Sequence, residues 1–107
     1  MTRIDLFRHD GVYCGMRCSG HSGFSEAGSD IVCAAVSTLV INCINSVETF
    51  TEDAFAVESD EAAAWISFRF TGEVSGAGRL LLDSTVLGLE NVAADYEDCI
   101  LIEVQEV

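Results

Sequence analysis

Two residues of this chain have the types and the spacing for covalent acyl transfer, Cys33 and His21. Cys33 follows closely on a predicted helix start at Asp30, where unpaired backbone N–H groups and the helix dipole favour negative charge. A cysteine in such a first turn tends towards the thiolate, which is the nucleophilic form. His21 can serve as its base from the preceding glycine-rich stretch, and the helix N–H groups can hold an oxyanion. On these residues alone, a purely structural cysteine remains the alternative.

Two polar residues accompany Cys33 on its helix. Asp30 precedes it by three positions and Ser37 follows it by four, so both flank it on one helix face. We interpret Asp30 first as a helix cap, since an acid beside a thiolate opposes ionisation, although it can also orient His21 by a hydrogen bond. Ser37 is interpreted as a small residue in a crowded helix that can donate to the sulfur or to a neighbouring carbonyl. Both are predicted as supporting residues.

A metal site is the competing interpretation of the same region. Three cysteines and a histidine in the first third of the chain are zinc-type ligands, namely Cys14, Cys18, His21 and Cys33. However, Cys14 and Cys18 fall on one predicted strand and would lie about 13 Å apart at roughly 3.3 Å per residue. That separation is too long for two ligands of one ion. We therefore predict no metal and no other cofactor.

Composition limits the partners of the chain. Its 107 residues suit one domain, 1–107, and its five cysteines are an odd number, as in a reducing compartment. The chain has eighteen acidic residues, five arginines and no lysine, for a net charge of −13. This charge repels nucleic acid and anionic membranes and attracts cations. The acidity equally suits solubility or a salt-loving host. Because no signal peptide or unbroken membrane-spanning run is found, we expect a cytoplasmic protein without direct nucleic-acid or membrane binding.

The elements that must position these residues follow from hydrophobic periodicity. Alternation over residues 3–8 and 12–18, separated by Asp10-Gly11, predicts a β-hairpin. The stretch Gly20–Ser29, with three glycines and three serines, predicts a loop. From Asp30 to about Val47 an apolar stripe predicts a helix capped by Ser29 or Asp30; its members are Val32, Val36, Leu39, Cys43 and Val47.

The second half of the chain repeats the arrangement. Apolar and polar residues alternate over 54–59 and 64–70, on either side of a predicted turn at Asp60-Glu61. A second helix is predicted from an apolar stripe of Leu82, Val86, Leu89 and Ala93. Alternation over residues 100–105 predicts a last strand. The predicted order is ββαββαβ. We expect an α+β two-layer sandwich, in which a mixed five-stranded sheet carries both helices on one face. The other face, with Trp65, is the expected partner surface.

The residues around Cys33 match a known pattern. Gly20-His21, followed by Gly28-Ser29-Asp30-Ile31-Val32-Cys33-Ala34-Ala35-Val36-Ser37, resembles the signature of the ribosomal-processing cysteine proteases, the Prp family. That signature is a Gly-His, a short variable loop, and Gly-x-Asp-Ile-Val-Cys-Ala with a serine four positions after the cysteine. The similarity in length and element order extends over nearly the whole chain. It implies a cysteine endopeptidase with Cys33 and His21 as its catalytic dyad.

The resemblance also implies a substrate and an assembly. Family members remove the N-terminal extension of a large-subunit ribosomal protein, the twenty-seventh of its series, in certain bacteria, and form homodimers. Their site lies under a mobile loop, here Gly20 to Gly28, in which Gly20, Gly23, Phe24 and Gly28 are expected to contact substrate, and Asp30 and Ser37 occupy the matching positions beside the nucleophile. A ribosomal protein is basic, which suits an acidic enzyme. The alternative is a non-catalytic ribosome-assembly or interaction module of the same fold.

Overall fold

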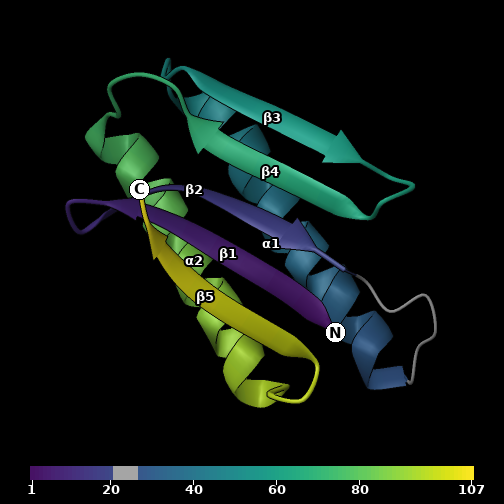
Figure 1. Ribbon diagram of the computed structural model, residues 1–107. Coiled ribbons are helices and arrows are strands. Elements are labelled where there is room, and N and C mark those ends of the chain that lie inside the picture. Colours follow the sequence, from purple (N-terminus) through teal and green to yellow (C-terminus); the bar gives the residue numbers. More distant parts are fainter. Residues whose placement is uncertain (21–26) are drawn as a thin grey trace.

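The computed structural model describes residues 1–20 and 27–107, with the backbone alone at 27–30. The elements of these residues, in chain order, are β1 (Thr2–His9), β2 (Val12–Ser19), α1 (Ala27–Phe50), β3 (Phe55–Asp60), β4 (Trp65–Phe70), α2 (Gly76–Asp95) and β5 (Ile100–Glu106). The predicted ββαββαβ order is therefore confirmed. Figure 1 shows both helices on one face of a single sheet, as the two-layer sandwich requires.

The sheet has the strand order β3-β4-β2-β1-β5. β1 pairs with β5 in parallel, whereas every other neighbouring pair is antiparallel, so the sheet is mixed as predicted. The parallel pair is anchored at its start by a backbone hydrogen bond of 2.9 Å from the Thr2 N–H to the Cys99 carbonyl. This pairing places β1 inside the sheet, between the central strand β2 and the edge strand β5.

The first hairpin turns where the sequence predicts. Asp10 and Gly11 have φ angles of 49° and 79°, the left-handed pair that a tight turn between antiparallel strands needs. The strand after the turn is less regular than its alternation suggests, because the register shifts between Phe7 and Arg8. Met16 and Cys18 are buried, but Val12 and Cys14, which lie on the turn side of the shift, are only half-buried.

The first helix carries the predicted apolar stripe but is longer than predicted. Along the stripe, Val32, Val36, Cys43 and Val47 are buried and Leu39 is half-buried against the core. The helix begins at Ala27 and ends at Phe50, so residues 27–29 belong to it and not to the loop predicted for Gly20–Ser29. Extending an existing helix requires no new nucleus, and Ala27 is a strong helix former, whereas Gly28 is a weak one.

The apolar character of this helix is used in the core. Residues Ile31–Phe50 are long and apolar enough to cross a membrane by length and composition, with a mean hydropathy of 1.7. One face of the segment packs on the sheet and on α2, whose own stripe buries Leu82, Val86 and Leu89 as predicted. Ile31, Ile41 and Phe50 are exposed on the remaining surface.

Candidate active site

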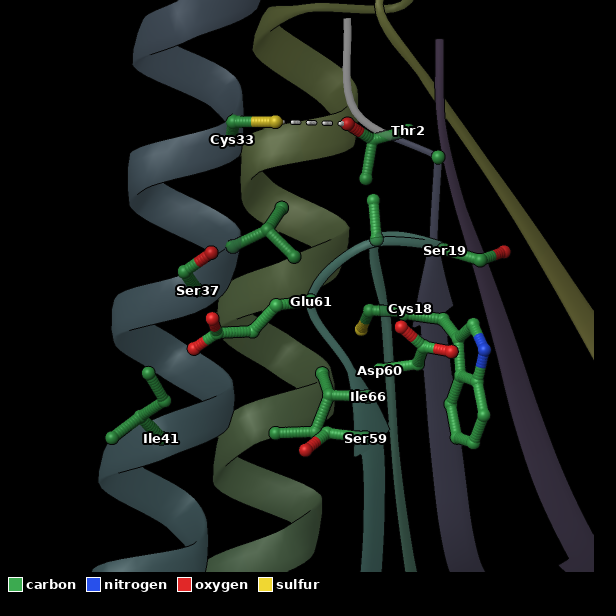
Figure 2. Close-up of a pocket in the computed structure, with 14 residues that line it drawn as sticks. Thr2, Cys18, Ser19, Cys33, Ser37, Ile41, Ser59, Asp60, Glu61 and Ile66 are labelled. Carbon is green, nitrogen blue, oxygen red and sulfur yellow. Dashed lines mark hydrogen bonds between the residues drawn. The ribbon is translucent and has the colours of Figure 1, made fainter. Parts of the chain in front are cut away.

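A cavity of about 380 Å³ opens between α1 and the end of the sheet at which β1 begins and β2 ends (Figure 2). Three parts of the chain line it. The α1 wall has Cys33, Val36, Ser37 and Ile41; the β1 and β2 wall has Thr2, Cys18, Ser19 and Gly20; and the β3–β4 hairpin supplies Ser59, Asp60, Glu61, Ala64, Trp65 and Ile66.

The helical wall brings two of the predicted site residues together. Cys33, Ser37 and Ile41 follow one another at four-residue steps, so they share a face of α1 over about 12 Å at about 1.5 Å per residue. Ser37 is exposed to the cavity and Cys33 is half-buried at one end of it. The predicted placement of these two residues on one face is confirmed. The Asp30 side chain lies outside the described residues.

The Cys33 sulfur has a hydroxyl neighbour that the sequence analysis did not single out. Thr2 Oγ1 lies 3.7 Å from Cys33 Sγ, within hydrogen-bond range for sulfur (Figure 2). Thr2 is 6% exposed, and its backbone is fixed by the hydrogen bond to Cys99. A threonine at a strand start is an ordinary β-former. Its contact with residue 33 arises only from packing, so no sequence pattern could have identified it.

A second thiol lines the same cavity. Burial raises the pKa of Cys18 to about 12, and the nearby Asp5 carboxylate adds to the shift. At neutral pH this thiol is therefore protonated, and a protonated thiol is a poor nucleophile. Of the two cysteines in the cavity, Cys33 is the one that is half-buried and open to a reactant.

The start of α1 contradicts one part of the predicted site. Because the helix begins at Ala27, Cys33 lies in its second turn and not in the first turn after Asp30. The N–H groups without intrahelical partners belong to residues 27–30, and the dipole acts mainly within the first turn. The predicted oxyanion donors in the turn of Cys33 are therefore wrong. Among the described residues, the hydrogen-bond partner of this sulfur is the Thr2 hydroxyl.

The chain enters the predicted loop from the edge of the cavity. Gly20 has φ 71°, and its N–H donates to the Ala64 carbonyl at 3.1 Å. Ala64 has a φ of 58°, which is uncommon for a residue with a Cβ. Strained backbone of this kind is found more often at functional sites than elsewhere. A Cβ at position 20 would lie 2.9 Å from the Met1 carbonyl oxygen, so the position requires glycine.

The remaining predicted loop residues cannot be placed relative to this edge. His21, Gly23 and Phe24 lie outside the described residues, and Gly28 is described by its backbone within α1. His21 is nevertheless joined directly to Gly20, which lines the cavity together with Cys33. The described residues therefore bring the chain to the cavity one position before His21.

The β3–β4 turn adds an acidic rim that was predicted only as a turn. Asp60 Oδ1 accepts a 3.0 Å hydrogen bond from the Ala63 N–H, and the Glu61 side chain extends from the hairpin towards α1 (Figure 2). The ion pairs among the described residues all use Arg3, Arg8 or His9, so neither carboxylate is neutralised by one. On the outer face beside this turn, the Arg17 guanidinium stacks 4.5 Å from the centroid of the Trp65 ring.

The competing metal site finds no support in the described part of the chain. Within residues 1–20 and 27–107, no three His, Cys, Asp or Glu side chains are grouped as metal ligands would be. Cys18 is a buried thiol in the cavity, whereas the Cys14 sulfur donates to the Phe7 carbonyl at 3.5 Å.

A second cavity, of about 500 Å³, lies at the opposite end of the sheet, beside the β1–β2 turn. His9 and Cys14 both line it. His9 Nδ1 lies 2.7 Å from the Val107 carbonyl oxygen, and His9 Nε2 lies 3.4 Å from Asp10. The hydrogen bond to Val107, followed by the charge of Asp10, raises the pKa of His9. His9 itself is exposed at the hairpin end.

Comparison with known proteins identifies the family of this chain. The family model for cysteine protease Prp matches residues 1–101. The ribosomal processing cysteine protease Prp of Bacillus subtilis is 28% identical over 94 residues, which cover 84% of each chain.

Solved structures agree on the fold. The essential ribosomal processing protease Prp from S. aureus, in complex with a substrate peptide, matches with a TM-score of 0.91 at 21% identity, covering 98% of this chain and 100% of that one. The same protease with a covalently linked product peptide matches with a TM-score of 0.88 at 22% identity and the same coverage. With nearly its whole length matched by the family model and by these relatives, the chain belongs to the cysteine protease Prp family.

Proposed function

We propose that this protein is an endopeptidase that removes the N-terminal extension from the precursor of the twenty-seventh large-subunit ribosomal protein, with Cys33 as nucleophile and His21 as base. The observation that carries the proposal is the position of Cys33, half-buried at the end of a cavity that is open to a peptide. Relatives called ribosomal processing proteases, and one of them in complex with a substrate peptide, support this substrate class.

The dimensions of the cavity suit an extended peptide. Its α1 wall runs about 12 Å from Cys33 to Ile41, and an extended chain advances about 3.3 Å per residue. Three to four residues on one side of the scissile bond therefore fit beside the helix. Ile41 and Ile66 offer apolar surface to their side chains, while Asp60 and Glu61 give the rim a negative charge. That charge, within a chain of net charge −13, favours a basic ribosomal protein.

The chemistry proceeds through an acyl-enzyme. His21 takes the proton of the Cys33 thiol, and the thiolate attacks the scissile carbonyl to form a tetrahedral adduct. The C–N bond then breaks, and the amine of the mature protein leaves with the proton from His21. Water, deprotonated by His21, attacks the thioester and releases the extension as a carboxylate, which restores the thiol. Asp30 and Ser37 support the dyad, and Gly20, Gly23, Phe24 and Gly28 are proposed to contact the substrate.

We further propose that the protein works in the cytoplasm as a homodimer, without a cofactor, a nucleic-acid ligand or a membrane. The mass of the purified protein in solution tests the dimer. A monomer at micromolar concentration would remove the dimer from the proposal and leave the chemistry untouched.

The decisive experiment is incubation of the extension-bearing precursor with wild type, Cys33→Ala and Cys14→Ala. Cys14 is the matched control, because it is also a half-buried cysteine at a cavity. Loss of the nucleophile should slow cleavage by about a thousandfold or more, whereas Cys14→Ala should cleave like wild type. Mass spectrometry of the precursor N-terminus reads the result, and repetition at higher salt should slow the wild type if charge attraction contributes. No cleavage by any variant would favour the non-catalytic assembly module.

A further inference from the structure

The contact between Thr2 and Cys33 points to a donor for the nucleophile. We propose that the Thr2 hydroxyl donates a hydrogen bond to the Cys33 thiolate and so favours the reactive form of the sulfur. This inference deepens the proposed function and rests on its assignment of Cys33 as the nucleophile. Thr2 Oγ1 and Cys33 Sγ lie 3.7 Å apart at the cavity wall (Figure 2).

The hydroxyl is held in place before any substrate arrives. Thr2 is 6% exposed, its partner in the parallel register is Ile100, and its N–H is bonded to Cys99. A β-branched side chain also has few rotamers, so little freedom is lost when its hydroxyl bonds to the sulfur. Such a preorganised donor needs no reorganisation when charge develops on the acceptor.

The direction of the hydrogen bond follows from the protonation state of the sulfur. A thiol is a weak donor and a weak acceptor, whereas a thiolate can only accept, so the hydroxyl must donate to it. A hydrogen bond to an ionised acceptor is roughly twice as strong as one between neutral groups. The contact therefore stabilises the thiolate more than the thiol, and this difference raises the fraction of sulfur that can attack.

The other titratable groups that line the cavity are weaker hydrogen-bond donors than a hydroxyl. The titratable groups that line the cavity with it are Cys18 from β2 and Asp60 and Glu61 from the β3–β4 turn, within the described residues. The two carboxylates can only accept hydrogen bonds when ionised, and the Cys18 thiol, whose pKa burial raises to about 12, is only a weak donor. The unpaired N–H groups of α1 lie three to six positions before Cys33. The Thr2 hydroxyl is therefore the donor that the described residues place at this sulfur.

Iodoacetamide alkylation of Cys33, followed by peptide mass spectrometry from pH 5.5 to 10, tests the inference without any protease assay. Thr2→Val keeps the shape of the side chain but lacks the donor, whereas Thr2→Ser keeps the donor. Thr2→Val should be alkylated about tenfold more slowly at neutral pH, with its pH profile moved by about one unit to higher pH. Its rate should approach that of wild type at the alkaline end, and Thr2→Ser should follow wild type throughout.

Each alternative outcome has a separate meaning. Identical profiles for Thr2→Val and wild type overturn the inference, and so does a loss of rate that is equal at every pH, because that pattern indicates a purely structural effect. Thr2→Ala, which adds no atoms, replaces Thr2→Val if the latter unfolds at a lower temperature than wild type. A wild-type Cys33 that resists alkylation at neutral pH would instead overturn the proposed function itself.

Discussion

The two ends of the sheet each have a cavity with a cysteine, but the two cysteines differ in their hydrogen-bond partners. At one end, a cavity includes Cys33, and the chain leaves it one residue before His21. At the other end, a cavity of comparable size includes Cys14 and His9. By residue type alone, each end has a cysteine, together with a histidine that either lines the cavity or follows a lining residue in the sequence.

The contacts of these residues separate the two ends. Cys14 donates to the Phe7 carbonyl, and His9 Nδ1 is bonded to the carbonyl of Val107, so both groups already stabilise the backbone. The Cys33 sulfur meets a side-chain hydroxyl that can donate to an anion. The comparison shows that a nucleophile is recognised by what its partners do to its charged form, and less by the presence of a histidine nearby.

Replacing each histidine by alanine should give the largest difference between the two ends, measured as the loss of kcat/KM. His21→Ala removes the proposed base and should lower kcat/KM by about 10²- to 10⁴-fold, the usual contribution of general acid–base catalysis. His9→Ala, at the other end, should cleave within about twofold of wild type, since surface substitutions away from a site change little. Steady-state cleavage of the precursor measures both variants. Equal losses in the two variants would mean that neither histidine acts as a specific base.

Gly20 and Gly11, one at each end, both have left-handed backbones, and their replacement should give a smaller difference, in the free energy of unfolding. Gly20→Ala and Gly11→Ala each introduce a Cβ at positive φ, which costs about 1–2 kcal/mol. The new Cβ at position 20 also meets the Met1 carbonyl at 2.9 Å, whereas position 11 has no atom within 4 Å. Gly20→Ala should therefore lower the free energy of unfolding more than Gly11→Ala in urea titrations. Only Gly20→Ala should also slow cleavage, because His21 follows it. A larger loss of stability at position 11 would contradict the contact at Gly20.

The smallest expected effect is a pH dependence of the stability that His9 contributes, at the end of the sheet with the second cavity. The pKa of His9 is raised above its ordinary value of 6.5 by the hydrogen bond to the Val107 carbonyl and then by Asp10. The folded state thus binds this proton more tightly, so the stabilisation is complete below about pH 6.5 and is lost as the pH rises through the folded pKa. Wild type should exceed His9→Gln in Tm by more at pH 5 than at pH 9. A difference that is constant with pH, or larger at pH 9, would show that His9 does not titrate in this way.

Much of the fold could be predicted because its signals are local. Period-two alternation located the strands, stripes at three- and four-residue spacing located both helices, and Asp10-Gly11 located the hairpin turn. The same local spacing placed Cys33 and Ser37 on one helix face, and the structure confirms it. The start of α1 was missed because Ala27 favours the helix while Gly28 and Ser29 suggest a loop, and tertiary packing decides between such opposing preferences.

The rest of the site depends on pairings between distant segments. Thr2 reaches Cys33 only because β1 lies between β2 and β5, and the acidic rim faces α1 only because β4 pairs with β2. Neither neighbour relation is written in the periodicity of any one segment. Ala64 illustrates the same limit, since a left-handed alanine at the turn has no sequence signal at all.

The parallel pairing of β1 with β5 has a consequence for the order in which the enzyme is made. Both His21 and Cys33 leave the ribosome long before Ile100, the residue that pairs with Thr2. Until β5 emerges, β1 has an open edge, and the carbonyl that anchors the Thr2 backbone does not yet exist in the nascent chain. If Thr2 acts on Cys33 as proposed, this part of the site is completed only once β5 has been made and has paired with β1.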